Sequence, residues 1–409
     1  MRTTTSKINF IQKYYKNHLI FLFNFKFIIF YNIIKMASDL QQRVLYHQSE
    51  PVSVQSKYNQ FNAVDFLISV GEGRSLVENS VRICADLRVL SAPDTVSTAH
   101  RTFDRNVGGH AFFSNMSVST QNQGLLENSQ NYPRMVAQDS IASLNEYDLL
   151  DSKHQCELKA TNQSISTDYC QGFTPALTTG TAVAKDADFS IKPLISLNKM
   201  DRDLPFSKSG LITVSANLAR NIDAIFGQAD DAATHYELRN IKLTFKSIPD
   251  PKIDSPVNMK VVHNVKSNIL SGAATISVNV PAVCDSVAIN FIPVAHDSAQ
   301  VFNSYKLENI KGFNEVQFMM NESVSNSMIT YVLSDYTEIL QRFIDAIEDT
   351  SHNQVSIDKF RANGGWGMGL KFDEPTDLSV NRFTAQIQSA VDNTYPVNVY
   401  MYFYASASI

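Results

Sequence analysis

The sequence predicts an all-β protein made of two antiparallel β-sandwiches in tandem. Runs of alternating apolar and polar residues recur along the chain, and period two is the repeat of a β-strand whose two faces differ. Few segments have helical periodicity, too few to cross over between parallel strands. The same order of elements also occurs twice: several strands, then a helix, then three further strands.

The last stretch of the chain gives the clearest strand. From Val397 to Ala405, apolar residues alternate with Asn398 and three tyrosines, and β-branched and aromatic residues favour strands. No Pro, Lys or Glu occurs in this stretch, although exposed edge strands usually carry such residues. We therefore expect this strand to have a neighbour on each side.

The composition is that of a globular protein. The chain has 409 residues, 18% of them charged and 44% hydrophobic, and two domains are expected at this length. The net charge of −5 argues against specific nucleic-acid binding, because proteins that coat nucleic acid carry a basic face or tail. The four cysteines (Cys84, Cys156, Cys170 and Cys284) lack zinc-binding spacing, so we expect reduced thiols and neither a metal nor a cofactor.

The first 35 residues differ in composition from the rest of the chain. Lys, Ile, Asn, Phe and Tyr dominate them, and ordinary composition begins at Met36. We expect residues 1–35 to be an untranslated or disordered extension, followed by a polar N-terminal arm over residues 36–60. The alternative is a membrane anchor in Leu19–Ile34, but that run is short and polar residues interrupt it, so we expect no membrane insertion.

Residues 61–250 are predicted to form the first sandwich. Asn106–Gly109 is predicted to be a turn, 151–186 a long loop, and Arg134–Leu144 a helix with Pro133 at its start. A second helical face lies between the last two strands, over 218–226, and Gly227 can end it. The expected strands are Val64–Val70, Val81–Val89, Ala111–Thr120, Phe189–Leu197, Leu211–Leu218 and Leu238–Ile248.

Residues 251–409 are predicted to form the second sandwich, after a boundary at Pro249-Asp250-Pro251. Asp335 and Glu338 have the spacing of a capping box, and an apolar stripe follows, so a helix is expected from Tyr336 to Ile347. The expected strands are Ile276–Val280, Val287–Phe291, Val316–Met320, Met328–Leu333, Gly367–Phe372, Phe383–Ile387 and Val397–Ala405.

No segment predicts catalytic, cofactor-binding or metal-binding residues. The Gly-rich run Asn363–Gly369 leads into a strand rather than a helix, so we interpret it as a hinge and not as a phosphate loop. His296, Asp297 and Ser298 are the residue types of a hydrolase triad, but adjacent residues cannot generally hydrogen-bond in the Ser–His–Asp order that catalysis requires. The protein is therefore not expected to be an enzyme.

Two further groups of residues have open interpretations. Asp345, Glu348 and Asp349 gather near a helix C-terminus, where we expect a solvated face that a cation or a basic partner could use. Tyr400, Tyr402 and Tyr404 share one face of the last strand. That face is either buried, which we favour, or an aromatic contact surface.

Two segments carry a resemblance to a known family. They are Asp188–Ile191 continuing through Leu204–Val214, and the block from Ile329 to the C-terminus. With the repeated order of elements, they resemble the double jelly-roll major capsid proteins of the adenovirus-like lineage, which includes virophages and Polinton-like viruses. The chain is short for the eukaryotic members, so loops that form towers in those proteins must be small here.

The resemblance implies a fold and a structural function. It implies two tandem eight-stranded antiparallel jelly rolls, each with a short helix in a late inter-strand connection. It also implies trimers that act as pseudo-hexameric blocks of an icosahedral virion capsid, with other copies and other capsid proteins as partners. The alternatives are a single jelly-roll penton protein that forms pentamers at the vertices and a non-viral tandem β-sandwich that binds glycans; a hydrolase ranks third.

Overall fold

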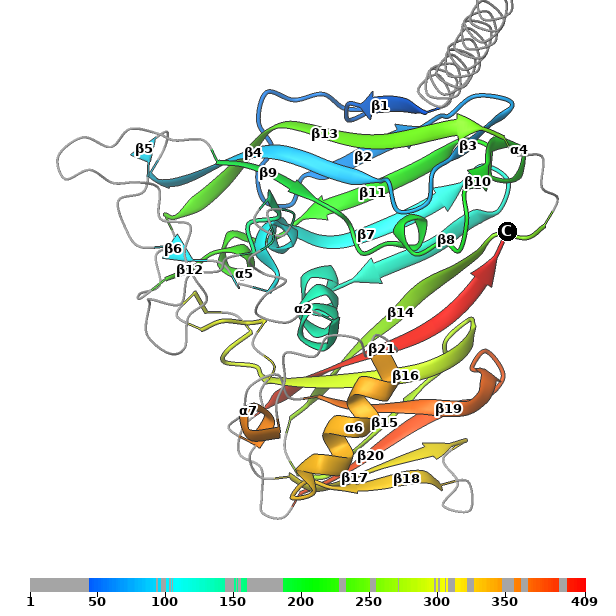
Figure 1. Ribbon diagram of the computed structural model, residues 1–409. Helices are drawn as coiled ribbons and strands as arrows, with labels where there is room; N and C mark the ends of the chain where they lie inside the picture. The colour runs from blue at the N-terminus through cyan, green and yellow to red at the C-terminus, as the bar shows by residue number, and fades with distance from the viewer. Residues whose placement is uncertain are drawn as a thin grey trace, which may run out of the picture.

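Figure 1 shows a computed structural model of the chain, in which two β-sandwiches lie one above the other. The structure describes residues 44–92, 95–96, 101–102, 104, 106–143, 151, 153, 156–159, 187–227, 233–250, 255–270, 272–297, 299–300, 302–305, 307, 313–321, 327–347, 357–361, 367–389 and 396–409. The 1–35 extension, the Leu19–Ile34 segment and most of the 151–186 loop therefore lie outside the described residues.

The lower sandwich consists of two four-stranded antiparallel sheets. Their strand orders are β14-β21-β16-β19 and β15-β20-β17-β18. The strands are β14 (Asn258–Ile269), β15 (Ala274–Val278), β16 (Val283–Pro293), β17 (Phe313–Met320), β18 (Ser327–Val332), β19 (Met368–Asp377), β20 (Phe383–Ser389) and β21 (Val397–Ser408).

The upper sandwich contains the same eight strands in the same order. One sheet contains the run β1-β13-β4-β9 and the other is β2-β11-β7-β8. The strands are β1 (Leu45–Ser49), β2 (Ala63–Ile68), β4 (Arg82–Ala92), β7 (Phe113–Thr120), β8 (Gly124–Gln130), β9 (Ala187–Ile191), β11 (Ile212–Leu218) and β13 (His235–Pro249). The prediction of two tandem eight-stranded antiparallel sandwiches is therefore confirmed.

The upper sandwich also has short additional strands. β3 (Arg74–Leu76), β5 (Thr95–Val96) and β10 (Leu204–Pro205) extend the sheet that contains β13, and β6 (Arg101–Thr102) pairs with β12 (Phe226–Gly227). Strand β1 lies in the part of the chain predicted to be an arm, and it pairs with β13 along its whole length.

The terminal strand β21 has the surroundings that its sequence predicts. It pairs with β14 over twelve positions on one side and with β16 on the other. Nine consecutive residues, Val397–Ala405, are buried, so both faces of the strand are covered. A strand that is covered on both faces and paired at both edges is central to its sheet.

In each sandwich a helix lies between the fifth and the sixth of the eight shared strands, before the last three strands, as the sequence predicts. Helix α2 (Tyr132–Ser143) follows β8, and α6 (Tyr336–Ile347) follows β18. The backbone N–H of Glu338 donates to the Asp335 carboxylate over 3.4 Å, which confirms that Asp335 caps α6. The remaining helices are short: α4 (Phe206–Ser209), α5 (Asn221–Ala224), α7 (Ile357–Arg361) and the 3-10 helices η1 (Gly108–Phe112) and η3 (Ser196–Asn198).

Several predicted boundaries are wrong. The strand expected over Phe189–Leu197 ends at Ile191, because Pro193 cannot continue a ladder and η3 follows. The turn expected at Asn106–Gly109 leads into the 3-10 helix η1, so β7 begins only at Phe113. The helix expected over 218–226 is limited to four residues, and Gly227 lies in β12 instead of ending a helix.

Strands β8 and β14 were missed at the sequence level. In β8 the inward position Glu127 is acidic, and its carboxylate accepts a hydrogen bond from the Ser196 N–H over 2.6 Å. In β14 the adjacent Val261 and Val262 are both buried, which breaks the alternation, and polar residues fill most of the remaining positions. Alternation of hydrophobic residues detects only strands that have one wet face and one dry face.

The glycines before and in β19 allow α6 to approach the sheet. A Cβ atom on Gly369 would lie 2.6 Å from the Cβ of Ala346, and one on Gly367 would meet the Phe343 ring. This close packing explains why glycine occupies positions 367 and 369, at the end of the run that we interpreted as a hinge. Residues 362–366 of that run lie outside the described residues.

We expect Gly369→Ala to destabilise the protein by about 1–3 kcal/mol, because the added methyl group overpacks the contact between α6 and β19. Thermal unfolding of the two proteins measures the difference. The double variant Gly369→Ala with Ala346→Gly removes the nearest colliding methyl group and should recover part of the loss. A melting temperature of Gly369→Ala equal to that of the wild type would contradict this packing.

Candidate functional site

The two helices α2 and α6 lie beside each other on the outer face of the sheet β14-β21-β16-β19 (Figure 1). Helix α6 belongs to the same sandwich as this sheet and packs on β16 and β19. Helix α2 belongs to the other sandwich and reaches β21 through two of its side chains. The junction between the two sandwiches is therefore the candidate functional site.

The tyrosine row of β21 is buried at this junction. Tyr400, Tyr402 and Tyr404 are 3%, 0% and 8% exposed, which confirms the interpretation of a buried face. The row faces α2 rather than the interior of its own sandwich, since the Tyr404 hydroxyl accepts a hydrogen bond from Gln138 Nε2 over 2.7 Å. Burial against a second sandwich explains why aromatic residues occupy both faces of this strand.

Arg134 of α2 is the most deeply buried cation of the junction. Its guanidinium contacts Asp297 Oδ1 at 3.1 Å and donates to the Ser304 carbonyl. The guanidinium carbon lies 4.4 Å from the centre of the Tyr400 ring, a distance at which the cation is attracted to the ring face. One helix side chain of the first sandwich therefore contacts both the last strand of the second sandwich and the segment after β16.

Asp297, in the segment after β16, is the acceptor around which the other polar groups gather. Its Oδ2 accepts hydrogen bonds from the Tyr400 hydroxyl at 2.6 Å, the Asn398 amide at 2.6 Å and the Lys266 ammonium at 3.1 Å. With Arg134 on Oδ1, both carboxylate oxygens are bonded. A buried carboxylate is tolerated when its charge is paired and its lone pairs are filled in this way.

Further polar contacts extend the junction on both sides of Arg134. Asn290 of β16 donates to the side-chain oxygen of Gln138, so that Gln138 links β16 to β21. On the other side, the amide of Asn303 donates to Asp104 Oδ2 over 2.7 Å. These contacts come from segments far apart in sequence, and β8 and the segment around Met200 also lie against β14, so the sandwiches meet at more than one place.

The charges of the junction stabilise one another. Burial alone would raise the pKa of Asp297, but Arg134, the Tyr400 hydroxyl and Lys266 together hold that pKa below its usual value. Burial would lower the pKa of Lys266, but Tyr400 and Asp297 raise it. Both groups therefore stay charged at neutral pH, and the site resembles a structural ion-pair network more than an acid–base pair.

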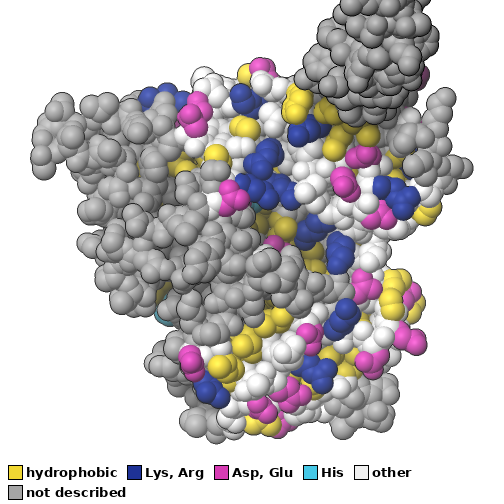
Figure 2. Space-filling view, viewed as in Figure 1, with side chains coloured by type: hydrophobic (Ala, Val, Ile, Leu, Met, Phe, Trp, Pro, Cys, Tyr) yellow, Lys and Arg dark blue, Asp and Glu magenta, His cyan; other side chains and the backbone are white. Residues whose placement is uncertain are grey.

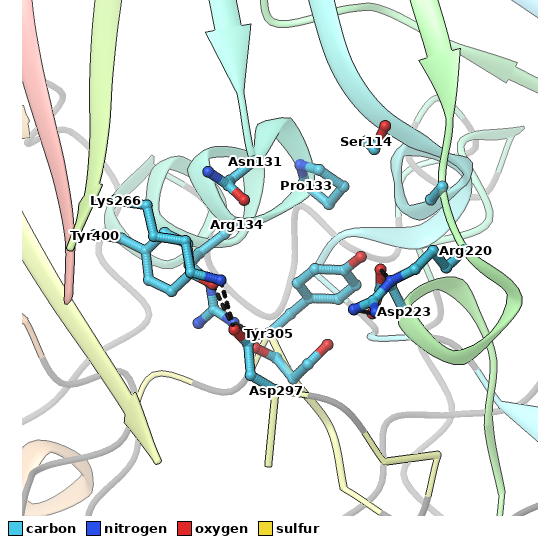
Figure 3. Close-up of a pocket in the computed structure, with 12 residues that line it drawn as sticks. Ser114, Asn131, Pro133, Arg134, Arg220, Asp223, Lys266, Asp297, Tyr305 and Tyr400 are labelled. Carbon is cyan, nitrogen blue, oxygen red and sulfur yellow. Dashed lines mark hydrogen bonds and ion pairs between the residues drawn. The ribbon is translucent and has the colours of Figure 1, made fainter. Parts of the chain in front are cut away.

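A cavity of about 90 Å³ opens beside this network (Figure 3). Arg134, Lys266 and Tyr400 lie on one side of it, and Arg220 and Asp223 lie on the other. Arg220 and Asp223 are bonded to each other by two contacts of 2.8 Å. The charged groups of the wall are therefore paired with one another, although the buried Nη1 of Arg134 has no hydrogen-bond partner among the described residues.

Solved structures with the same arrangement come from viruses. The Faustovirus major capsid protein has a TM-score of 0.57 at 7% identity, covering 90% of this chain and 90% of that chain. VP54 of PBCV-1, fitted into a reconstruction of the virophage Sputnik, has a TM-score of 0.56 at 10% identity, covering 90% and 94%. The mavirus major capsid protein has a TM-score of 0.52 at 10% identity, covering 88% and 86%. The chain has the double jelly-roll fold. No protein-family model and no curated protein matches the sequence.

The side chains of His296 and Asp297, two of the residues considered as a hydrolase triad, have different partners in the double jelly roll. Asp297 belongs to the junction between the jelly rolls, where its carboxylate serves Arg134, Lys266 and Tyr400. The His296 ring stacks on Phe302 with ring centres 4.1 Å apart. Ser298 lies outside the described residues. The importance of Asp297 could not be read from its neighbours in sequence, because its partners are at least thirty-one positions away.

The other residues weighed at the sequence level are scattered. Asp345 is half-buried and accepts a hydrogen bond from Gln341 over 2.9 Å, whereas Glu348 and Asp349 lie outside the described residues. Cys84, Cys156 and Cys284 are free thiols, and Cys170 is outside the described residues. Among the described residues, no group of three His, Cys, Asp or Glu side chains could hold a metal ion, and no helix is long and apolar enough to span a membrane.

A second group of buried titratable residues lies within the first jelly roll and was also missed. His110 contacts the Tyr132 hydroxyl at 2.7 Å and the Glu157 carboxylate at 3.7 Å, and Lys159 contacts the same carboxylate at 3.3 Å. These groups fix the segment around Glu157 to η1 and to the start of α2. All four side chains are buried, so the cluster supports the base of α2.

We expect Arg134→Met to destabilise the protein by about 3–5 kcal/mol, because it leaves the Asp297 carboxylate buried without its main counter-charge. Urea unfolding of the full chain measures the effect. The control is Arg361→Met, which removes an exposed arginine on α7 and should change stability by less than about 0.5 kcal/mol. The double variant with Asp297→Asn should lose less than the sum of the losses of Arg134→Met and Asp297→Asn measured singly; a loss equal to that sum would show that the pair is not coupled.

The lowered pKa of Asp297 predicts a dependence of stability on pH. The unfolded carboxyl has a pKa of about 3.9, so the contribution of Asp297 is present above that value and is lost as pH falls through the lower folded pKa. We expect the unfolding free energy of the wild type to fall more steeply between about pH 5 and pH 2 than that of Asp297→Asn, as measured by urea titration. Parallel curves would contradict the assignment.

Proposed function

We propose that this protein is a major capsid protein, the main building block of an icosahedral viral shell. The observation that carries the proposal is the pair of jelly rolls with identical strand order, fixed side by side by the buried Arg134–Asp297 junction. A rigid block with two similar lateral units can occupy two neighbouring positions of a six-fold ring. Its work is structural and not enzymatic, and its location is the virion.

Similar structures support this proposal through the whole length of the chain. The matched Faustovirus and mavirus proteins are described as major capsid proteins, and each is covered to 86% or more. The likeness spans both jelly rolls and not a single sandwich. We therefore infer that three copies associate into a trimer whose six jelly rolls form a pseudo-hexagonal unit.

The strength of such a shell comes from many weak lateral contacts. Closed homo-oligomers need surfaces that complement one another when related by the symmetry, and interfaces of this kind bury large areas. Contacts between neighbouring trimers then add over the shell, so that each can be weak by itself. The residues that carry the function are therefore the outer surfaces of the jelly rolls, together with the junction that holds them in register.

The alternative functions have less support. A single jelly-roll penton protein with an inserted domain is disfavoured because the second sandwich has a complete set of eight strands of its own. A glycan-binding module would present aromatic side chains in a groove. The groove of about 700 Å³ between β8 and β14 is lined by aliphatic and polar residues, with no Phe, Tyr or Trp among its described lining.

The native mass of the purified protein tests the proposal. We expect multi-angle light scattering of residues 36–409 to give a trimer, and electron microscopy of the same sample to show pseudo-hexagonal particles. A pentamer would favour the penton alternative. A monomer that binds a glycan array would overturn the capsid function.

A further inference from the structure

The cavity of about 90 Å³ beside Arg134 has walls from both jelly rolls (Figure 3). Arg220, directly before α5, belongs to the first jelly roll. Lys266 of β14 and Tyr305, in the segment between β16 and β17, belong to the second. One water molecule needs about 10–15 Å³ of such a cavity. The space is therefore large enough for several waters or for one small polyatomic ligand.

The wall of the cavity has more hydrogen-bond donors than its own acceptors use. Arg220 donates to the two carboxylate oxygens of Asp223 through Nε and Nη2, and its Nη1 has no partner among the described residues. Lys266 donates to Asp297 and interacts with the Tyr400 hydroxyl, so at least one of its three N–H groups is left. Neither a guanidinium nor an ammonium can accept a hydrogen bond. A ligand that satisfies these groups must therefore supply acceptors.

The Tyr305 hydroxyl is a further donor in this cavity. Tyr305 is 6% exposed, and its hydroxyl has no hydrogen-bond partner within the part of the chain that the structure describes. Figure 3 shows its ring between the two sides of the cavity, with the hydroxyl directed to the side of Arg220 and Asp223. Burial raises the pKa of this hydroxyl well above its ordinary value, so it keeps its proton at neutral pH. Since a buried hydroxyl is seldom left without a partner, the geometry indicates a bound molecule beside it.

The charged groups of the wall add up to a positive charge. The cations are Arg134, Arg220 and Lys266 and the carboxylates are Asp223 and Asp297, which gives three positive charges against two negative ones. Arg134 is 2% exposed, so dissolved salt screens its charge little. The start of α2 also lines the cavity, and the positive end of the helix dipole acts in the same direction. The excess is local, because the whole chain has a net charge of −5.

We propose that this cavity binds one small oxyanion of the phosphate or sulfate type, held by Arg220 of the first jelly roll and by Lys266 and Tyr305 of the second. Such an anion offers acceptor oxygens in several directions, and hydrogen bonds between charged groups are the stronger ones in proteins. The side chains of Arg220 and Lys266 are 46% and 44% exposed, so a solute can reach them. The anion contacts both jelly rolls and therefore stabilises the arrangement in which they lie together. This site does not depend on the capsid function proposed above.

A cluster of waters is the competing occupant of the cavity. Water can accept hydrogen bonds from Arg220, Lys266 and Tyr305, but it carries no charge and leaves the positive excess of the wall unbalanced. The two occupants therefore differ in how they respond to a change of charge. Removing a wall carboxylate should strengthen the binding of an anion, and removing a wall cation should weaken it.

Titration calorimetry of the full chain with inorganic phosphate tests the site, with sodium chloride keeping the ionic strength constant. We expect one saturable site per chain with a dissociation constant below about 1 mM. Arg220→Met should raise that constant at least about tenfold, because it removes a cation and its donors. Tyr305→Phe should raise it about threefold to tenfold, because it removes one neutral donor. Asp223→Asn should lower it at least about threefold, because it removes a competing carboxylate.

The matched control is Arg361→Met, which removes an exposed arginine on α7 and should bind phosphate as the wild type does. Thermal unfolding without phosphate shows whether each variant is folded, and phosphate should raise the melting temperature of the wild type more than that of Arg220→Met. If Arg220→Met does not fold, the conservative Tyr305→Phe decides. No saturable binding, or the same affinity in the wild type and in both donor variants, would show that water alone fills the cavity. Equal affinity for acetate would overturn the assignment to an anion with acceptors on several sides.

Discussion

The burial of the outer face of β21 is the constraint on which the rest of the structure depends. A central strand with aromatic residues on both faces must be covered twice, once by its own sandwich and once by another element. The second cover comes from α2 of the first jelly roll. Arg134 and Asp297 then fix how α2 lies on the strand, because a buried ion pair tolerates only positions in which both charges are satisfied. Specific geometry, more than added stability, is the consequence of such a pair.

The two jelly rolls share their connectivity but differ in the surfaces they present. The outer face of β21 carries hydrogen-bonded tyrosines and is covered by α2, whereas the outer face of β13 carries Lys242, Thr244 and Lys246, which are half-buried. Helices α2 and α6 differ as well, since the third residue of α2 is a buried arginine and that of α6 is an exposed glutamate.

Close packing against the sheet sets a second limit on sequence. Gly367 and Gly369 allow the backbone of β19 to approach α6, and any side chain there would meet Phe343 or Ala346. Helix α6 is thereby held closely on its own jelly roll.

Much of the fold can be predicted from the sequence, because polar and apolar residues alternate along a strand that has one solvent-exposed face and one buried face. The strand Val397–Ala405, the capped helix from Tyr336 and the repeated order of elements were all predicted in this way. Strands β8 and β14 were not, since a buried glutamate in β8 and two adjacent buried valines in β14 break the alternation. The sequence also indicated that the tyrosine row is buried.

Only the tertiary structure shows which element covers that tyrosine row. Asp297 is separated from Arg134 by 163 positions, and from Tyr400 by 103, so no local pattern connects them. Local sequence determines which residues form strands and helices, because propensity and periodicity act over a few residues. Which faces meet depends on contacts between distant segments, and these are satisfied only when the whole chain has folded.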